Sequence, residues 1–243
     1  YYAASQYKEA AIEFKNAIQI KPDDAKAHYE LGLAYLKLGG PTYLPAAFQA
    51  FSKAVKLDPD HLDAQTRIGE LHLLSRDIDK AAAQAELVTS KDKSHLDATI
   101  LLANTKAAKR KFVEAKALLT ALSEAHPEST KPRLALSSIH LVSGDRDAAK
   151  EVLKKIIATD KSIEPRLALS TVYLMDNNVP AAEETLNSAL NDNPGSVAVL
   201  SSLTNLYIIT KKTEMAAQTA EKLITASENR PEGYIILANI QKS

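Results

Sequence analysis

The chain of 243 residues contains no cysteine. This absence excludes disulfides, thiolate nucleophiles and thiolate metal ligands together, and it fits a reducing or an oxidising compartment equally well. Glycine is also scarce, and the seven glycines form no glycine-rich loop of the kind that binds phosphate groups. We therefore expect no thiol chemistry and no cofactor, and the compartment stays open.

Neither sign of charge is in excess, since 30 lysines and arginines balance 30 aspartates and glutamates. No overall field draws the chain toward nucleic acid or acidic lipid, so a partner has to be recognised locally. The longest stretch without charge, residues 193–210, contains Pro194, Gly195 and Asn205 and cannot serve as a membrane-spanning helix. A soluble chain with no direct membrane span is expected.

Two segments of the chain are almost identical: KPRLALSSIHL begins at Lys131 and EPRLALSTVYL begins at Glu164. The residues shared by the two copies are proline, leucine and serine and not a set of reactive side chains, so the feature that is repeated is helix packing. The same period of about 34 residues runs through the whole chain, which is the signature of a repeat architecture. It is carried by an alanine ladder at Ala10, Ala47, Ala81, Ala115, Ala149, Ala182 and Ala216, an aliphatic ladder at Leu31, Ile68, Leu102, Leu136, Leu169, Leu203 and Leu237, and a small-residue ladder at Gly32, Gly69, Ala103, Ser137, Ser170, Thr204 and Ala238.

Between these positions the apolar pattern is helical. Leu31, Ala34, Tyr35 and Leu38 lie at i, i+3, i+4 and i+7, on one stripe of a helix. Each period thus predicts two antiparallel helices, and small residues let them approach closely. Prolines are expected to end the second helix of a pair, because proline cannot continue the helical ladder; they are Pro22, Pro59, Pro127 and Pro194. One pair cannot bury its own apolar faces, so the pairs must stack as a solenoid.

The motif L-G-x2-Y at Leu31, Gly32 and Tyr35, followed by Ala47, Phe51, Ala54 and Pro59, resembles the tetratricopeptide repeat (TPR). The resemblance covers the whole chain and implies an all-α fold, a right-handed α-solenoid superhelix of stacked antiparallel helix pairs. We expect one solenoid over 1–243, with a second helix at 1–24, six full units at 25–230 and an opening helix at 231–243. Because both ends fall inside a unit, a fragment of a longer array is expected.

No catalytic or metal site is predicted. The six histidines lie at His28, His61, His72, His95, His126 and His140, and none is three or four residues from another, as a helical metal pair requires. His72 and His140 occupy an aromatic packing slot of the repeat. The acidic run at Asp58, Asp60 and Asp63 lacks the glycine and glutamate of a calcium loop. We expect no enzyme.

Two further features have structural interpretations. The basic cluster Lys106, Lys109, Arg110 and Lys111 is interpreted as a solvated turn, because nucleic-acid binding needs such clusters repeated along one face. The segment GGPTYLP from Gly39 is expected to be a turn three residues longer than its counterparts. Such an insertion costs little entropy; the alternative is a contact at the groove edge with Tyr43 as an exposed anchor.

The resemblance also implies a binding surface, since the first helix of each TPR unit lines an inner groove. We call the predicted partner-binding residues the groove set: Tyr29, Leu33, Leu36, Glu70, Leu73, Ile100, Asn104, Leu134, Ser138, Leu141, Leu167, Thr171, Leu174, Asn205, Ile208 and Asn239. Packing within the array accounts for part of their apolar character. Asn104, Asn205 and Asn239 stand where relatives that bind extended peptides contact the peptide main chain.

The predicted function is a non-catalytic scaffold that binds an extended or helical segment of a partner protein. Two alternatives stay open. The first is a bacterial envelope assembly factor, because the run from Tyr7 to Gly39 resembles repeat lipoproteins of exopolysaccharide export and protein-sorting systems; it would lie on the periplasmic side, lipid-anchored through a part outside this chain. The second is a substrate-recruiting arm of an enzyme. Exposed repeat ends also allow self-association.

Overall fold

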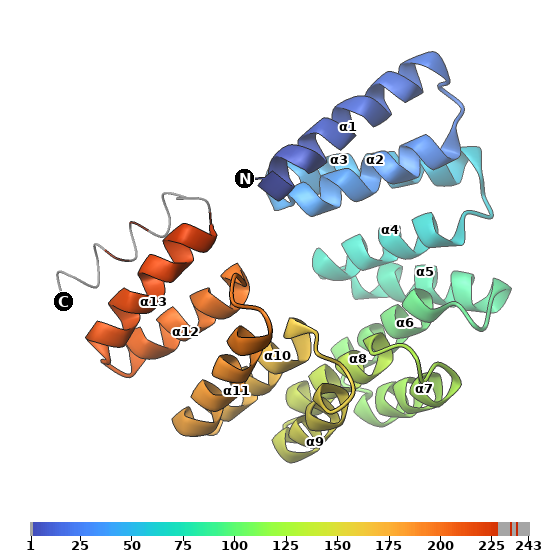
Figure 1. Ribbon diagram of the computed structural model, residues 1–243. Helices are drawn as coiled ribbons and strands as arrows, with labels where there is room; N and C mark the ends of the chain where they lie inside the picture. Colours follow the sequence, from blue (N-terminus) through green and yellow to red (C-terminus); the bar gives the residue numbers. More distant parts are fainter. Residues whose placement is uncertain (1, 228–233, 235–236, 238–243) are drawn as a thin grey trace. The chain divides into compact units, whose positions relative to one another are not determined.

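The computed structural model describes residues 2–227 together with Tyr234 and Leu237, and over this part the chain is built from helices without a strand. The helices are α1 (Tyr2–Ile20), α2 (Ala25–Leu38), α3 (Gly40–Leu57), α4 (Leu62–Leu74), α5 (Ile78–Lys91), α6 (Leu96–Ala108), α7 (Phe112–Ala125), α8 (Lys131–Val142), α9 (Arg146–Ile157), α10 (Ile163–Met175), α11 (Val179–Asp192), α12 (Val197–Ile209) and α13 (Thr213–Ala226). The predicted all-α class and its helix pairs are confirmed (Figure 1).

The helices end where the sequence predicts. The second helices α1, α3, α7 and α11 each stop two residues before the expected proline. Several first and second helices begin at a side chain that accepts a backbone N–H, as Asp24, Asp77 and Asn178 do. Such N-caps satisfy donors that the first helical turn leaves open.

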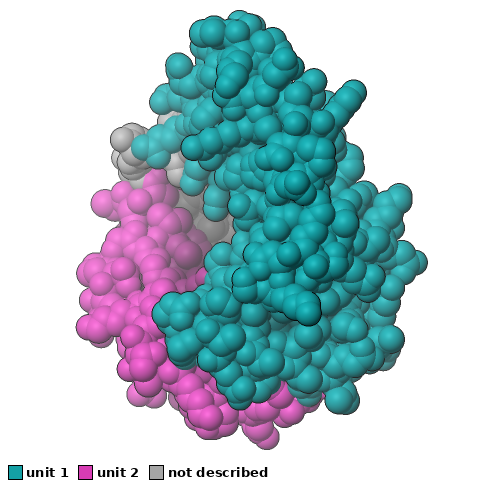
Figure 2. All heavy atoms as spheres, turned by 90° about the vertical axis from the view of Figure 1, so that its right-hand side faces the viewer, with its two compact units in different colours: residues 1–135 teal, residues 136–243 magenta. Residues whose placement is uncertain are grey.

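The chain falls into two compact units, residues 1–135 and 136–243, shown in different colours in Figure 2. Their boundary lies within α8. The expectation of one continuous solenoid over 1–243 stays a prediction.

In unit 1, α1 packs on α2, and the pairs α2/α3, α4/α5 and α6/α7 follow one another. The alanine ladder lies in the core, where Ala47, Ala81 and Ala115 are fully buried. The small-residue ladder sets the spacing between helices: a Cβ built on Gly32 would lie 2.5 Å from Cε1 of Phe51, and one on Gly69 would lie 2.5 Å from Cδ2 of Leu101. Glycine is therefore required at both positions by close packing.

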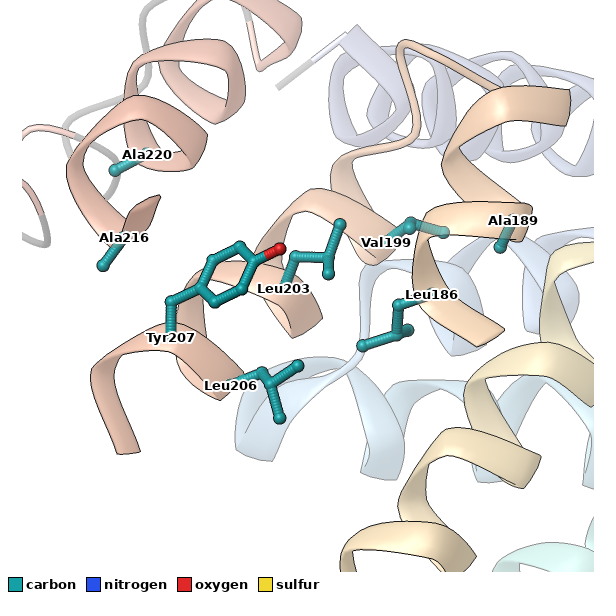
Figure 3. Close-up of a cluster of buried hydrophobic side chains, with 8 residues drawn as sticks. All are labelled: Leu186, Ala189, Val199, Leu203, Leu206, Tyr207, Ala216 and Ala220. Atoms are coloured by element: carbon teal, nitrogen blue, oxygen red, sulfur yellow. The ribbon is translucent and has the colours of Figure 1, made fainter. Parts of the chain in front are cut away.

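In unit 2, α9 packs on α10, and the pairs α10/α11 and α12/α13 stack on each other. A core cluster of eight buried residues lies here (Figure 3), and side chains of α12 fill the space between α11 and α13. Its members are Leu186, Ala189, Val199, Leu203, Leu206, Tyr207, Ala216 and Ala220. The ladder position Ala238 lies outside the described residues.

The expectation of a long turn at GGPTYLP is wrong. Only Gly39 lies outside a helix, and α3 begins at Gly40, so that the added residues form an extra N-terminal turn of a helix 18 residues long. Pro41 suits the first turn of a helix, where its missing N–H costs nothing. Tyr43 is half-buried because its ring stacks on Tyr35, with centroids 5.9 Å apart. It is therefore a packing residue of α2 and α3 and not an exposed anchor.

Among the helices that the structure describes, none combines the length and apolar character needed to cross a lipid bilayer.

Candidate partner-binding surface

Four residues of the groove set surround one pocket in unit 1. Glu70 and Leu73 of α4 and Ile100 and Asn104 of α6 line it together with Leu74 and Leu101, and its volume is about 270 Å³. We call it the α4–α6 pocket. It lies between the first helices of two successive pairs, which is where the repeat resemblance implies a groove.

Close packing of α4 against α6 forms the floor of this pocket. Gly69 lets Leu101 approach to a distance that a methyl group would block. Buried threonines on the two helices hydrogen-bond to their own helix, as in the bond from Oγ1 of Thr66 to the carbonyl oxygen of Leu62 at 2.9 Å. These hydroxyls need no partner from the neighbouring helix, so apolar contacts dominate the seam between α4 and α6.

An ionic chain runs along one side of the pocket. Both carboxylate oxygens of Glu70 accept from Nη1 of Arg67 at 2.8 Å, and Nη2 of Arg67 donates to Asp97 at 2.6 Å. Lys131 of α8 then donates to the other oxygen of Asp97 at 2.8 Å. The chain links three successive first helices within unit 1 and fixes the Glu70 carboxylate at the pocket edge.

The pKa values of these groups follow from their partners. Burial by itself would lower the pKa of Arg67, but the charges of Glu70 and Asp97 outweigh burial and raise it. Burial would raise the pKa of Asp97, but the hydrogen bond from Lys131 and the charge of Arg67 outweigh it and lower the pKa. Arg67 and Asp97 are therefore both charged at neutral pH.

The Asn104 amide is the polar group of the pocket that is open to a ligand. It is half-buried, and its side chain makes no hydrogen bond within the described part of the chain. An amide offers both donors and an acceptor, which is what the main chain of an extended peptide requires.

The groove-set residues of α2 lie differently. Tyr29, Leu33 and Leu36 are half-buried and pack against the core cluster of α3 and α4. The Tyr29 ring lies 5.7 Å from that of Phe51 and 4.6 Å from that of His61, and burial raises the pKa of its hydroxyl. Much of their apolar surface is thus used by the fold itself.

In unit 2 the groove set divides between packing and exposed positions. Leu167 and Leu174 of α10 pack against the core cluster. Thr171 and Asn205 are exposed, and Ile208 is 43% exposed. Leu141 is half-buried and Ser138 exposed, while Leu134, half-buried, belongs to unit 1. Asn239 lies outside the described residues, and for all these positions partner binding stays a prediction.

The histidines have structural roles. Nδ1 of His61 accepts from the backbone N–H of Ala64 at 3.3 Å, and Nδ1 of His95 accepts from that of Ala98 at 3.2 Å, so both cap the helices that follow. The ring of His72 packs edge-on against Phe48, in line with its predicted packing slot. Histidine as an N-cap was not expected from the sequence.

The charged runs are engaged in ion pairs. In the acidic run, Asp60 pairs with Lys91 at 2.7 Å. In the basic cluster, Lys106 pairs with Glu114 at 2.6 Å and Lys109 with Asp79 at 2.7 Å. Across the described residues, no group of three or more histidine, aspartate or glutamate side chains has an arrangement that could hold a metal ion.

Sequence reasoning missed a larger pocket in unit 1, with a volume of about 610 Å³, between α3, the end of α4 and the start of α5. We call it the α3–α4 pocket. Its lining residues are Leu44, Pro45, Phe48, Gln49, Leu71, His72, Leu74, Ser75, Asp77 and Lys80. No signal in the sequence marks this pocket, because Leu44 and Pro45 stand at the same repeat positions as Ile78 and Asp79.

Models of the tetratricopeptide repeat match residues 44–94 and, twice in overlapping stretches, residues 106–167 and 143–206, and a TPR repeat model matches residues 1–39. The chain belongs to the tetratricopeptide repeat family. This confirms the resemblance seen in its leucine, alanine and small-residue ladders.

Among curated proteins, the TPR chain is 28% identical to Hsp70-Hsp90 organizing protein 3 of Arabidopsis thaliana over 81 residues, 33% of this chain and 14% of that protein. It is 26% identical to Superkiller complex protein 3 of Homo sapiens over 98 residues, 40% of this chain and 6% of that protein. The chain thus spans only a small part of the length of either relative.

Solved structures show the same fold. A thermophilic TPR protein of Thermus thermophilus matches with a TM-score of 0.67 at 19% identity, over 76% of this chain and 99% of that one. Yeast Tom70 also matches with a TM-score of 0.67, at 15% identity, over 99% of this chain and 59% of that one.

Proposed function

We propose that this TPR chain is a non-catalytic scaffold that binds an extended or helical segment of a partner protein along its first helices. The observation that carries the proposal is the α4–α6 pocket, where Glu70, Leu73, Ile100 and Asn104 converge from two successive first helices. The name of the relative Hsp70-Hsp90 organizing protein 3 describes a protein that organises other proteins, and this supports the same class of function.

The pocket suits one apolar side chain of a bound segment. Leu73, Leu74, Ile100 and Leu101 supply apolar contacts, and the Asn104 amide is placed to hydrogen-bond the main chain beside that side chain. Burying an apolar side chain yields about 1.5–3 kcal/mol, and association entropy removes several kcal/mol from the sum over a few such anchors. A short peptide should therefore bind with a dissociation constant of about micromolar or weaker.

Selection from a displayed random peptide library, followed by titration of the selected peptides, tests the proposal. We expect Leu73→Glu to weaken their binding by about tenfold or more, because it places a charge in the apolar pocket. Asn104→Ala should weaken it less, by removing the amide alone. The matched control is Leu87→Glu on the second helix α5, where the side chain is 43% exposed and lines neither pocket.

Each variant is first checked for native helicity by circular dichroism. If the selected peptides bind Leu73→Glu as tightly as the parent chain, the first helices of unit 1 are not the binding surface and the proposal fails. No contact in the described part of the chain supports the envelope or the enzyme-arm alternative.

A further inference from the structure

The helix α1 of unit 1 is covered by a first helix on one flank only. Other second helices pack between two first helices: α3 between α2 and α4, α5 between α4 and α6, and α11 between α10 and α12. Among the described helices, α1 packs extensively on α2 alone, and it lies at the edge of unit 1 (Figure 1). The flank of α1 where the repeat places a first helix is therefore open.

The residues on this open flank are the ones that the repeat buries elsewhere. In α3 the three core positions of a second helix are fully buried, and they are Ala47, Phe51 and Ala54. Their counterparts one repeat earlier are Ala10, Phe14 and Ala17, which we call the α1 face. Ala10 and Phe14 are only half-buried, and Ala17 is exposed. Because the end surfaces of a soluble solenoid are normally polar, this apolar face is suited to a further helix.

The packing of α2 on α3 shows which helix fits over such a face. The Phe51 ring lies so close to Gly32 that a Cβ on Gly32 would be 2.5 Å from it, and Gly32 follows the buried Leu31. Close packing over Phe14 therefore requires a helix that presents a small residue directly after a leucine. This is the chemistry of a first helix of the repeat.

The chain contains one such leucine and small-residue pair that has no second helix of its own within the 243 residues. The pair is Leu237 and Ala238, in the segment 231–243 that is expected to be a first helix. Leu237 packs against the core cluster of α11, α12 and α13, as a leucine of a first helix should. Ala238, outside the described residues, stands at the repeat position that Gly32 uses to meet its second helix.

We propose that the α1 face binds segment 231–243 of a second copy of this chain, which packs on α1 as α2 packs on α3. The contact joins two different surfaces, so it can repeat from copy to copy and does not stop at a dimer. The inference does not depend on the function proposed for the first helices, because the α4–α6 pocket takes no part in the contact.

Light scattering over a concentration series of the whole chain tests the proposal. We expect the average mass to rise with concentration and to pass that of a dimer. The dissociation constant of each contact should be roughly 10–500 µM, because few large side chains are buried and association entropy opposes them.

Two variants on α1 locate the contact. Ala17→Glu should weaken association by about tenfold or more, because it places a charge in the α1 face, and the fold should tolerate it since Ala17 is exposed. Ile12→Glu is the matched control on the same helix. Ile12 is 56% exposed and lies five residues before Ala17, about 140° away around the helix, so this variant should associate like the parent chain.

A mixing experiment tests whether the two surfaces differ. Ala238→Glu removes the small residue of the tail segment, so this variant and Ala17→Glu should each remain monomeric when alone. Mixed in equal amounts, they should form a dimer and nothing larger, because one copy contributes the intact tail and the other the intact α1 face. Circular dichroism checks that each variant keeps its native helicity.

A parent chain that stays monomeric up to about 1 mM would overturn the proposal, since the expected dissociation constant lies below that concentration. Equal weakening by Ile12→Glu and Ala17→Glu would also refute it, because the contact would then not be specific to the α1 face. A mixture of Ala17→Glu and Ala238→Glu that forms no dimer would show that these two surfaces do not bind each other.

Discussion

The two units fill the same small-residue position of the repeat in different ways. Unit 1 uses Gly32, Gly69 and Ala103, and neighbouring side chains approach the two glycines so closely that a Cβ would lie 2.5 Å away. Unit 2 uses Ser170 and Thr204, both buried, whose hydroxyls donate to carbonyl oxygens of their own helices at 2.8 Å. The repeat therefore requires small volume at this position, and a hydroxyl is acceptable when its own helix satisfies it.

The facing position on the second helix varies with the small residue. Gly32 is met by Phe51, the largest fully buried side chain, whereas the corresponding slot opposite Thr204 holds Ala220. In these two pairs a larger residue on one helix faces a smaller one on the other. At Gly69 both members of the pair are small, since Ala85 stands opposite, and Leu101 of the next pair fills the space.

The largest predicted effect is at Gly32. Gly32→Ala would place a methyl group against the Phe51 ring, which is enclosed and cannot move away. We expect the free energy of unfolding to fall by about 1–3 kcal/mol, even though alanine is the better helix former. The comparison variant in unit 2, Ser170→Ala, should change it by less than about 1 kcal/mol. Urea denaturation of both checks this; equal effects would show that the two units do not differ in packing tolerance.

A second prediction concerns the ionic chain of unit 1. Asp97→Asn removes the charge that holds both Arg67 and Lys131, so we expect a loss of about 1–2 kcal/mol at pH 7. The unit 2 counterpart Asp192→Asn should cost less, because Arg166 keeps hydrogen bonds to the carbonyl oxygens of Lys161 and Ser162. Thermal unfolding of the two variants measures both losses of stability. A larger loss in Asp192→Asn than in Asp97→Asn would contradict the prediction.

The stability that Asp97 contributes through Arg67 and Lys131 should change with pH in a definite direction. Because the folded state lowers the pKa of Asp97, its stabilisation is present above the ordinary aspartate value of about 3.9 and is lost as the pH falls through the lower folded value. The parent chain should therefore lose more stability on acidification below pH 4 than Asp97→Asn does. A constant difference between the two chains down to pH 2 would exclude this account.

The smallest predicted effect concerns the turns inside each pair. Arg76 and Arg110 in unit 1 adopt φ of 63° and 59°, and Asn177 and Lys211 in unit 2 adopt φ of 56° and 58°, whereas Gly144 in unit 2 holds the same kind of position with φ of 87°. This region is unfavourable for residues with a side chain. Arg110→Gly should stabilise the chain by about 0.5–1 kcal/mol and Gly144→Ala should destabilise it by about 1 kcal/mol. If the melting temperatures of Arg110→Gly and Gly144→Ala move in the same direction, backbone strain at these turn residues does not explain their stability.

The helix pairs and their packing could be predicted from the sequence, because each packing position recurs with the same type of residue in successive repeats. The ladders of Ala47, Leu31 and Gly32 predicted helix pairs, their limits and their close approach, and prolines such as Pro59 located the ends of second helices. The insertion at Gly39 was misread as a loop, because glycine and proline favour turns and also the first turn of a helix. The groove set was harder: Leu33 and Leu73 both belong to it, yet Leu33 packs on the core and Leu73 lines a pocket.

The sequence by itself thus determined the family, the all-α class and the order of the helix pairs. The regular spacing of small and large residues, and the residues that begin and end helices, are local properties of the chain. Only the tertiary structure decided which apolar side chains are used up in packing and which remain for a partner. That outcome depends on the space between neighbouring helices, which closes over Leu33 and leaves a pocket at Leu73.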